Sequence, residues 1–195
     1  MNSARSIETG TAVGQATRRL RDAGSPSPRL DAELLAAHVA GRDRAWVLAH
    51  PEAEVDATQL EALVGRRAAG EPIAYIRGFK EWHSLRIRTD ARALIPRPET
   101  ELLADAAADE IDRRLASGSV VAWEVATGSG AVAVFLALRF ARAIAGAQLR
   151  LIATDISPDA LALAAENLAG HDVADAVALR AADLLAPAGA ELPRP

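Results

Sequence analysis

The chain has 195 residues and a net charge of −4, and half of its residues are hydrophobic, which is typical of a globular protein. It contains no cysteine, which excludes disulfides, thiolate metal sites and cysteine nucleophiles. Its arginines are scattered and form no basic stripe, so no nucleic-acid face is expected. Because it has neither an apolar signal core nor an apolar run near the ~18 residues of a membrane span, we expect a cytoplasmic protein without a membrane anchor.

Residues 1–70 are predicted to form a small helical domain. Ser27 offers a capping hydroxyl and Pro28 suits the first helical position, so a helix is expected to begin there and to end at Gly41. Asp56 is predicted to cap a further helix. A bundle of this size has little core of its own, so we expect it to be joined to something larger.

Residues 71–97 have a different pattern, with short apolar stretches on either side of Gly78. The alternation of apolar and charged residues over 85–88 is typical of a half-exposed strand. We therefore predict a hairpin linker with strands over 73–76 and 85–87.

Residues 98–195 are predicted to be the first half of an α/β domain. Strands alternate with helices, which indicates a parallel, doubly wound sheet of the Rossmann-like type. A loop is predicted over 186–195, which is rich in Ala, Pro and Gly. The expected strands are 120–125, 149–154 and 176–179, and the expected helices are 99–116, 131–144 and one that begins at Ser157-Pro158.

A cofactor-binding loop is predicted where the first of these strands meets its helix. Small residues let the backbone approach a ligand closely, and a carboxylate after the next strand can accept hydrogen bonds from ribose hydroxyls. Asp183 follows the third strand, where an adenine amino group could lie. The candidate cofactor-binding residues are Glu124, Ala126, Thr127, Gly128, Ser129, Gly130, Asp155, Asp183 and Leu184.

Three interpretations of this loop are open. It could be a tight turn without a ligand, and its glycine spacing also fits a nicotinamide-dependent oxidoreductase. Glu124 is the only charged side chain from Ala122 to Leu138. A carboxylate beside the loop favours a cationic ligand such as S-adenosylmethionine over a pyrophosphate.

Several motifs resemble the bacterial release-factor glutamine methyltransferases, also called the HemK family. The resemblance implies an incomplete Rossmann-like methyltransferase domain, S-adenosylmethionine as cofactor, and release factors as protein substrates. It also implies methylation of the glutamine side-chain nitrogen in their Gly-Gly-Gln motif, with the helical domain helping to hold the substrate. The matching segments are 29–39, 70–78, 94–101, 127–130 and 153–157.

Two departures from the family pattern stand out. The family usually has glycine at the position of Ala126, where a methyl group is tolerable if φ stays negative. The family's Asn-Pro-Pro-Tyr motif is absent, since Asn2 and Asn167 are the only asparagines and neither precedes proline. No catalytic residue is therefore predicted in this chain. We expect a C-terminally truncated family member, with an inactive product that binds only cofactor or partner as the alternative.

Overall fold

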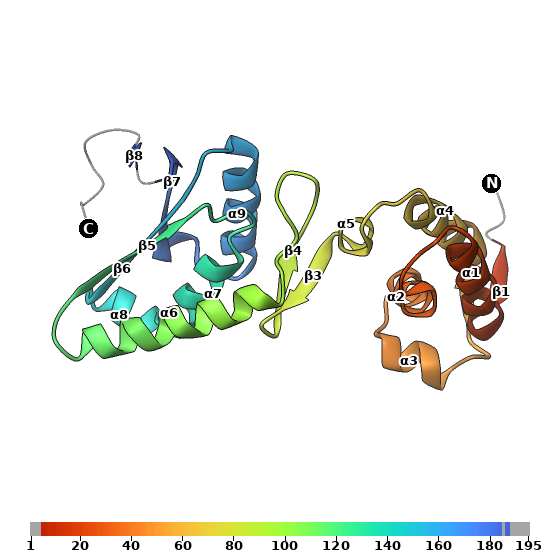
Figure 1. Cartoon of the computed structure of the whole chain (residues 1–195). Coiled ribbons are helices and arrows are strands. Elements are labelled where there is room, and N and C mark those ends of the chain that lie inside the picture. Colours follow the sequence, from red (N-terminus) through yellow and green to blue (C-terminus); the bar gives the residue numbers. More distant parts are fainter. Residues whose placement is uncertain (1–4, 185, 188–195) are drawn as a thin grey trace. The chain divides into compact units, whose positions relative to one another are not determined.

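The computed structural model describes residues 5–184 and 186–187. The chain divides into two compact units, Met1–Arg77 and Gly78–Pro195 (Figure 1). The finer division into a helical domain, a linker over 71–97 and a methyltransferase domain from 98 stays a prediction. No helix in the described ranges is long and apolar enough to span a membrane.

The first unit is a small helical bundle with its own apolar core. Leu20 and Leu35 are fully buried where α1 packs against α2, and Leu60 and Val64 of α4, which contacts both helices, belong to the same core. This agrees with the predicted helical character of the region. Its helices are α1 Thr9–Asp22, α2 Pro28–Ala40, α3 Arg44–Ala49, α4 Ala57–Ala68 and α5 Ile73–Arg77.

The helix ends show which local predictions were right. The Asp56 carboxylate accepts hydrogen bonds from the Thr58 and Gln59 N–H groups, so it caps α4 as predicted. The helix predicted from Ser27-Pro28 to Gly41 is confirmed as α2, but the predicted cap was wrong, because the Ser27 hydroxyl makes no capping bond. It donates instead to the buried Asp31 carboxylate at 3.1 Å. The buried acid attracts the hydroxyl away from the helix end.

Three elements of the first unit differ from the sequence prediction. Strands β1 Ser6–Glu8 and β2 Glu54–Asp56 pair antiparallel, although neither was predicted. Residues 73–77 form helix α5 and not the expected strand, because Pro72 begins a helical turn. Its carbonyl accepts hydrogen bonds from the Tyr75 and Ile76 N–H groups.

The second unit begins with a β-hairpin, β3 Phe79–Trp82 and β4 Leu85–Arg88. Its two turn residues, His83 and Ser84, both have positive φ, which matches the tight turn that hairpins favour. The Trp82 indole is buried and donates to the Arg97 carbonyl at 3.0 Å. The hairpin is therefore part of this unit's packed structure.

A parallel sheet forms the centre of the second unit. Its order is β5-β6-β7-β8, with the first three strands parallel, which confirms the predicted α/β class and the incomplete Rossmann-like fold. The strands β5, β6 and β7 follow in sequence across the sheet, so right-handed crossovers place their connecting helices on one face. The strands are β5 Val120–Val125, β6 Leu149–Asp155, β7 Val177–Asp183 and the short antiparallel β8 Ala186–Pro187.

The helices of this unit are gathered beside the sheet (Figure 1). The predicted helix over 131–144 is divided at Phe140, whose backbone leaves the helical conformation where its ring is buried in the core. Strand β7 extends to Asp183, so that residue ends the strand and does not follow it. Part of the predicted loop, 186–187, is strand; residues 188–195 lie outside the described residues. The helices are α6 Glu99–Leu115, α7 Ala131–Arg139, α8 Ala141–Ala145 and α9 Pro158–Gly170, with a 3-10 turn, η1, at Ala174–Ala176.

Candidate cofactor site

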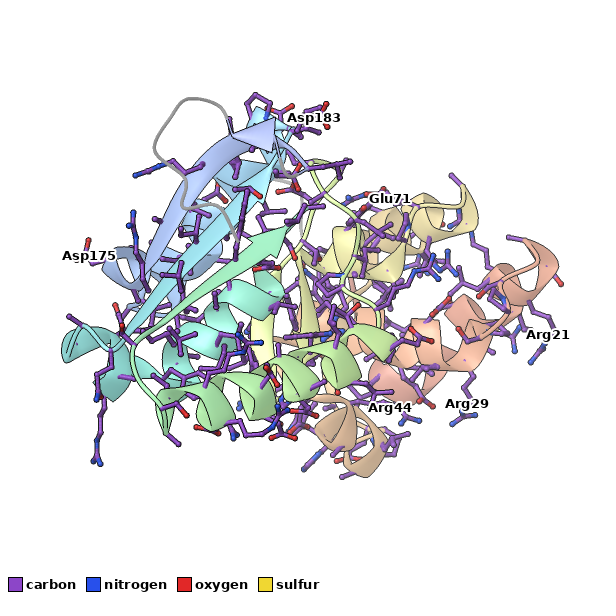
Figure 2. The ribbon with its side chains drawn as sticks, turned by 60° about the vertical axis from the view of Figure 1, so that its left-hand side comes forward. Arg21, Arg29, Arg44, Glu71, Asp175 and Asp183 are labelled. Carbon is purple, nitrogen blue, oxygen red and sulfur yellow. The ribbon has the colours of Figure 1, made fainter. Side chains whose placement is uncertain are left out.

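The predicted site residues lie at one edge of the parallel sheet. Parallel strands present their carboxyl ends on the same side, and in open α/β sheets ligands bind outside these ends. The ends of β5, β6 and β7 are Val125, Asp155 and Asp183. Figure 2 shows Asp183 at this end of the sheet and Asp175, which precedes β7, at the other.

The loop from β5 to α7 makes a tight turn. The Thr127 N–H donates to the Thr154 carbonyl of β6 at 2.8 Å. Within the loop, the Gly130 N–H donates to the Thr127 carbonyl at 2.9 Å. Gly128 and Gly130 have positive φ values of 57° and 76°, which favour glycine. A Cβ on Gly130 would lie 2.9 Å from Ala164 Cβ of α9. Glycine is thus required there both by conformation and by close packing.

Ala126 corrects one expectation. Its methyl group was expected to be tolerable with a negative φ, but φ is +58°. A non-glycine residue in this region is strained by about 1–2 kcal/mol. The left-handed conformation of this position provides a physical reason for the glycine usual in the family.

Asp155 organises the loop from the end of β6. Its Oδ2 accepts a hydrogen bond from the Gly128 N–H at 2.9 Å, and its Oδ1 accepts one from the Ser157 N–H at 3.0 Å. Each carboxylate oxygen can accept a further hydrogen bond. The residue can therefore hold the turn and still accept donors from a ligand.

Glu124 lies in an unusual environment at the end of β5. Its Oε2 atom is buried and, within the described part of the chain, has no hydrogen-bond partner, although the residue as a whole is partly exposed. Burial raises the pKa of Glu124 to about 7, and the charge of Asp155 adds to the shift. The nearby Thr127 hydroxyl and Ala133 N–H act in the opposite direction and lower the pKa of Glu124. Neither meets the geometry of a hydrogen bond to Oε2.

The remaining predicted residues differ in how far they are exposed. Asp183 and Leu184 are both exposed beyond the body of β7, and Leu184 has a φ of 48°. Thr127 and Ser129 are buried in the loop, and the Thr127 hydroxyl has no hydrogen-bond partner among the residues described. The structure therefore brings the loop, Glu124 and Asp155 together, and places Asp183 at the same sheet edge.

A groove of about 920 Å³ lies along β5, between α6, α7 and the sheet. Its wall includes Glu124 and the exposed apolar side chains Leu103 and Val121. Neither Gly128 nor Asp155 lines it. The groove therefore reaches the candidate site only through Glu124.

Sequence reasoning missed two groups that support the loop. The Trp123 indole donates to Thr154 Oγ1 at 3.0 Å, and this hydroxyl donates to the Glu124 carbonyl at 3.2 Å. The buried Asn167 of α9 donates to the Ser129 carbonyl at 2.8 Å. No sequence motif marks Asn167, because its partners lie far away in the chain.

The chemistry of the site suits a ligand that carries hydrogen-bond donors and positive charge. Two buried acceptors, Glu124 Oε2 and Thr127 Oγ1, lack partners in the described ranges, and buried polar groups are normally satisfied. A pyrophosphate would instead meet the negative charge of Asp155, and that of Glu124 once its carboxyl is ionised above pH 7. Together, the glycine turn, the carboxylates and the parallel sheet define a Rossmann-like domain of the methyltransferase class.

Comparison with known proteins agrees with this class. Residues 11–78 match the family described as the PrmC N-terminal domain. A release factor glutamine methyltransferase of Deinococcus radiodurans is 43% identical over 167 residues, which are 82% of this chain and 56% of the relative. Enzymes of the same name from Vibrio cholerae and Koribacter versatilis are each 38% identical, over 83% and 89% of this chain and 54% and 59% of the relatives. The chain is therefore a relative of the release factor glutamine methyltransferases, and it spans a little over half the length of these three proteins.

Proposed function

We propose that this protein binds S-adenosylmethionine at the carboxyl edge of β5, β6 and β7 and serves methyl transfer to peptide chain release factors. The acceptor would be the glutamine side-chain nitrogen of their Gly-Gly-Gln motif. The observation that carries the proposal is the glycine turn, which Asp155 holds by a hydrogen bond and beside which Glu124 Oε2 is buried without a partner among the described residues. Release factors act on ribosomes in the cytoplasm, so the proposal places the protein there.

Each candidate residue has a role in this proposal. Asp155 would accept hydrogen bonds from the ribose hydroxyls, and Asp183 with Leu184 would border the adenine. Ala126, Thr127, Gly128, Ser129 and Gly130 would form the turn beside the amino-acid part of the ligand. Glu124 would offset the ligand's positive charge. Bound S-adenosylmethionine would supply a methyl group on a positively charged sulfur.

No residue of this chain is assigned to catalysis. An amide nitrogen is a poor nucleophile and needs acceptors that orient it. Asn167 cannot take that role, because its amide group is buried and already bonded to the Arg88 and Ser129 backbone. The helical unit is proposed to help hold the release factor, in line with its match to the PrmC N-terminal domain.

Asp155→Ala is expected to weaken S-adenosylmethionine binding by about 1.5–3 kcal/mol, the contribution of hydrogen bonds to a charged group. Titration calorimetry of the full chain measures this change. Asp175→Ala is the matched control, since Asp175 is exposed at the opposite end of the sheet (Figure 2). Unchanged affinity in a folded Asp155→Ala protein would contradict the assignment. Tighter binding of NAD than of S-adenosylmethionine would contradict the methyltransferase class.

A further inference from the structure

Asn167 is a buried polar side chain at the centre of a hydrogen-bond network. It is only 3% exposed. Its Oδ1 accepts from the Arg88 N–H at 2.7 Å, and its Nδ2 donates to the Arg88 carbonyl at 3.1 Å and to the Ser129 carbonyl at 2.8 Å. One donor and two acceptors surround the amide, so this orientation is the one that satisfies all three partners.

On one side, Asn167 holds the cofactor loop. Ser129 lies between the two glycines whose positive φ values form the turn, and the Gly128 N–H is bonded to Asp155. The bond from Asn167 fixes the peptide that follows Ser129. It therefore determines where Gly130 and the first turn of α7 lie relative to α9.

On the other side, Asn167 holds the end of the hairpin. It pairs with both backbone groups of Arg88, as a neighbouring strand would. The adjacent Glu166 adds two ion-paired hydrogen bonds to Arg92, at 2.7 and 3.0 Å, and one ion pair to Arg88 at 3.2 Å. Arg92 is also bonded to Asp90 at 2.7 Å. Residues 88–92 are thus attached to the same turn of α9 that supports the loop.

We infer that Asn167 is a positioning residue that couples the cofactor loop to residues 88–92. The coupling to a ligand rests on the proposed function; the mechanical link between the two segments does not. Coupling between two sites is reciprocal. A ligand that orders the loop therefore stabilises residues 88–92 through Asn167, and breaking the Asn167 hydrogen bonds weakens ligand binding.

Amide hydrogen exchange of the full chain tests this link first without ligand. In Asn167→Asp, a carboxylate oxygen of the same size replaces Nδ2 and faces the Ser129 and Arg88 carbonyls. We expect faster exchange in both segments, 126–131 and 88–92, in that variant. Glu166→Gln is the matched control, because it breaks the ion pairs to Arg92 and Arg88 but leaves the bond to Ser129. It should accelerate exchange at 88–92 only. Unchanged loop exchange in Asn167→Asp, or equal loop exchange in both variants, overturns the inference.

The second arm adds saturating S-adenosylmethionine. In the natural chain we expect slower exchange at 126–131, at 155–157 and also at 88–92. In Asn167→Asp, the protection at 155–157 should persist while that at 88–92 is lost, and the affinity should fall at least tenfold. Ligand protection in the natural chain that stops short of 88–92 overturns the coupling, and this measurement needs no variant to fold. Failure of S-adenosylmethionine to bind would contradict the proposed function and leave the ligand-free comparison to decide the role of Asn167.

Discussion

Gly130→Ala is expected to lower the free energy of unfolding of the second unit by about 2–5 kcal/mol. About 1–2 kcal/mol arises because alanine is strained at the φ of +76°. A further 1–3 kcal/mol is typical of overpacking, since the new Cβ would lie 2.9 Å from Ala164 Cβ and 3.1 Å from its Cα. These contacts are with a buried helix residue, which has little room to move.

Urea unfolding followed by tryptophan fluorescence measures this loss. A Trp46→Phe background leaves Trp82 and Trp123, which both lie in the second unit. Gly128→Ala is the matched control, because its φ is +57° but nothing lies within 4 Å of the added Cβ. It should lose only about 1 kcal/mol.

A double-mutant cycle separates conformational strain from packing. Ala164→Gly removes the atom that Gly130→Ala would meet, so it should restore part of the stability that Gly130→Ala loses. Alone, it should destabilise α9 by about 1 kcal/mol, the usual effect of glycine in a helix. Equal losses of unfolding free energy for Gly130→Ala and Gly128→Ala would show that the close packing of α9 against the loop adds nothing to the effect of the positive φ.

Glu124→Gln is expected to stabilise the protein at high pH by up to about 3 kcal/mol. Burial raises the pKa of Glu124 to about 7 in the folded state, from 4.5 in the unfolded chain. The folded state therefore keeps a proton that the unfolded chain releases between these values. Stability from this group is fully present below pH 4.5 and is lost as pH rises through 7. Each pKa unit corresponds to about 1.4 kcal/mol.

The glutamine variant has no proton to lose, so its stability should change less over the same pH window. The two proteins should be similar near pH 4.5 and differ most near pH 8, as measured by urea unfolding in the Trp46→Phe background. Asp175→Asn, an exposed substitution at the other end of the sheet, should follow the parent protein throughout. Parallel pH profiles of Glu124→Gln and the parent would contradict the buried, protonated carboxyl.

The same substitution should weaken S-adenosylmethionine binding at pH 8. Burial disfavours the ionised carboxylate of Glu124, and a positively charged ligand would stabilise it. A gain in stability with a loss of affinity is the expected sign of a group retained for binding. Titration calorimetry on the variant checks this second effect. Unchanged affinity would contradict a role of Glu124 in ligand binding, and the raised pKa would then have no functional explanation.

Much of the architecture was predictable because it depends on nearby residues. The first two parallel strands, the caps at Asp56 and Ser157, and the glycine loop all follow from local patterns. A cap needs an acceptor two or three positions before the N–H groups it meets. Parallel strands also end at one edge, so the juxtaposition of Asp155 with the loop could be expected from topology.

Other features depended on partners far away in the chain. The strand pair β1 and β2 joins segments that lie 48 residues apart at Ser6 and Glu54. Ser27 loses its capping role because Asp31 is buried beside it, where Arg67 also binds the carboxylate at 2.7 Å. Local propensity predicts a cap at Ser27, but leaving the buried Asp31 carboxylate without hydrogen-bond partners would cost more than leaving the helix end uncapped.

The candidate site shows the same division. The sequence by itself determined that a small-residue turn and two carboxylates meet at the sheet edge. Only the tertiary structure decided that Ala126 is strained, that Glu124 Oε2 is buried without a hydrogen-bond partner among the described residues, and that Asn167 supports the turn from α9. Burial and hydrogen bonding of a side chain depend on what the folded chain brings next to it, and spacing along the sequence carries no record of those neighbours.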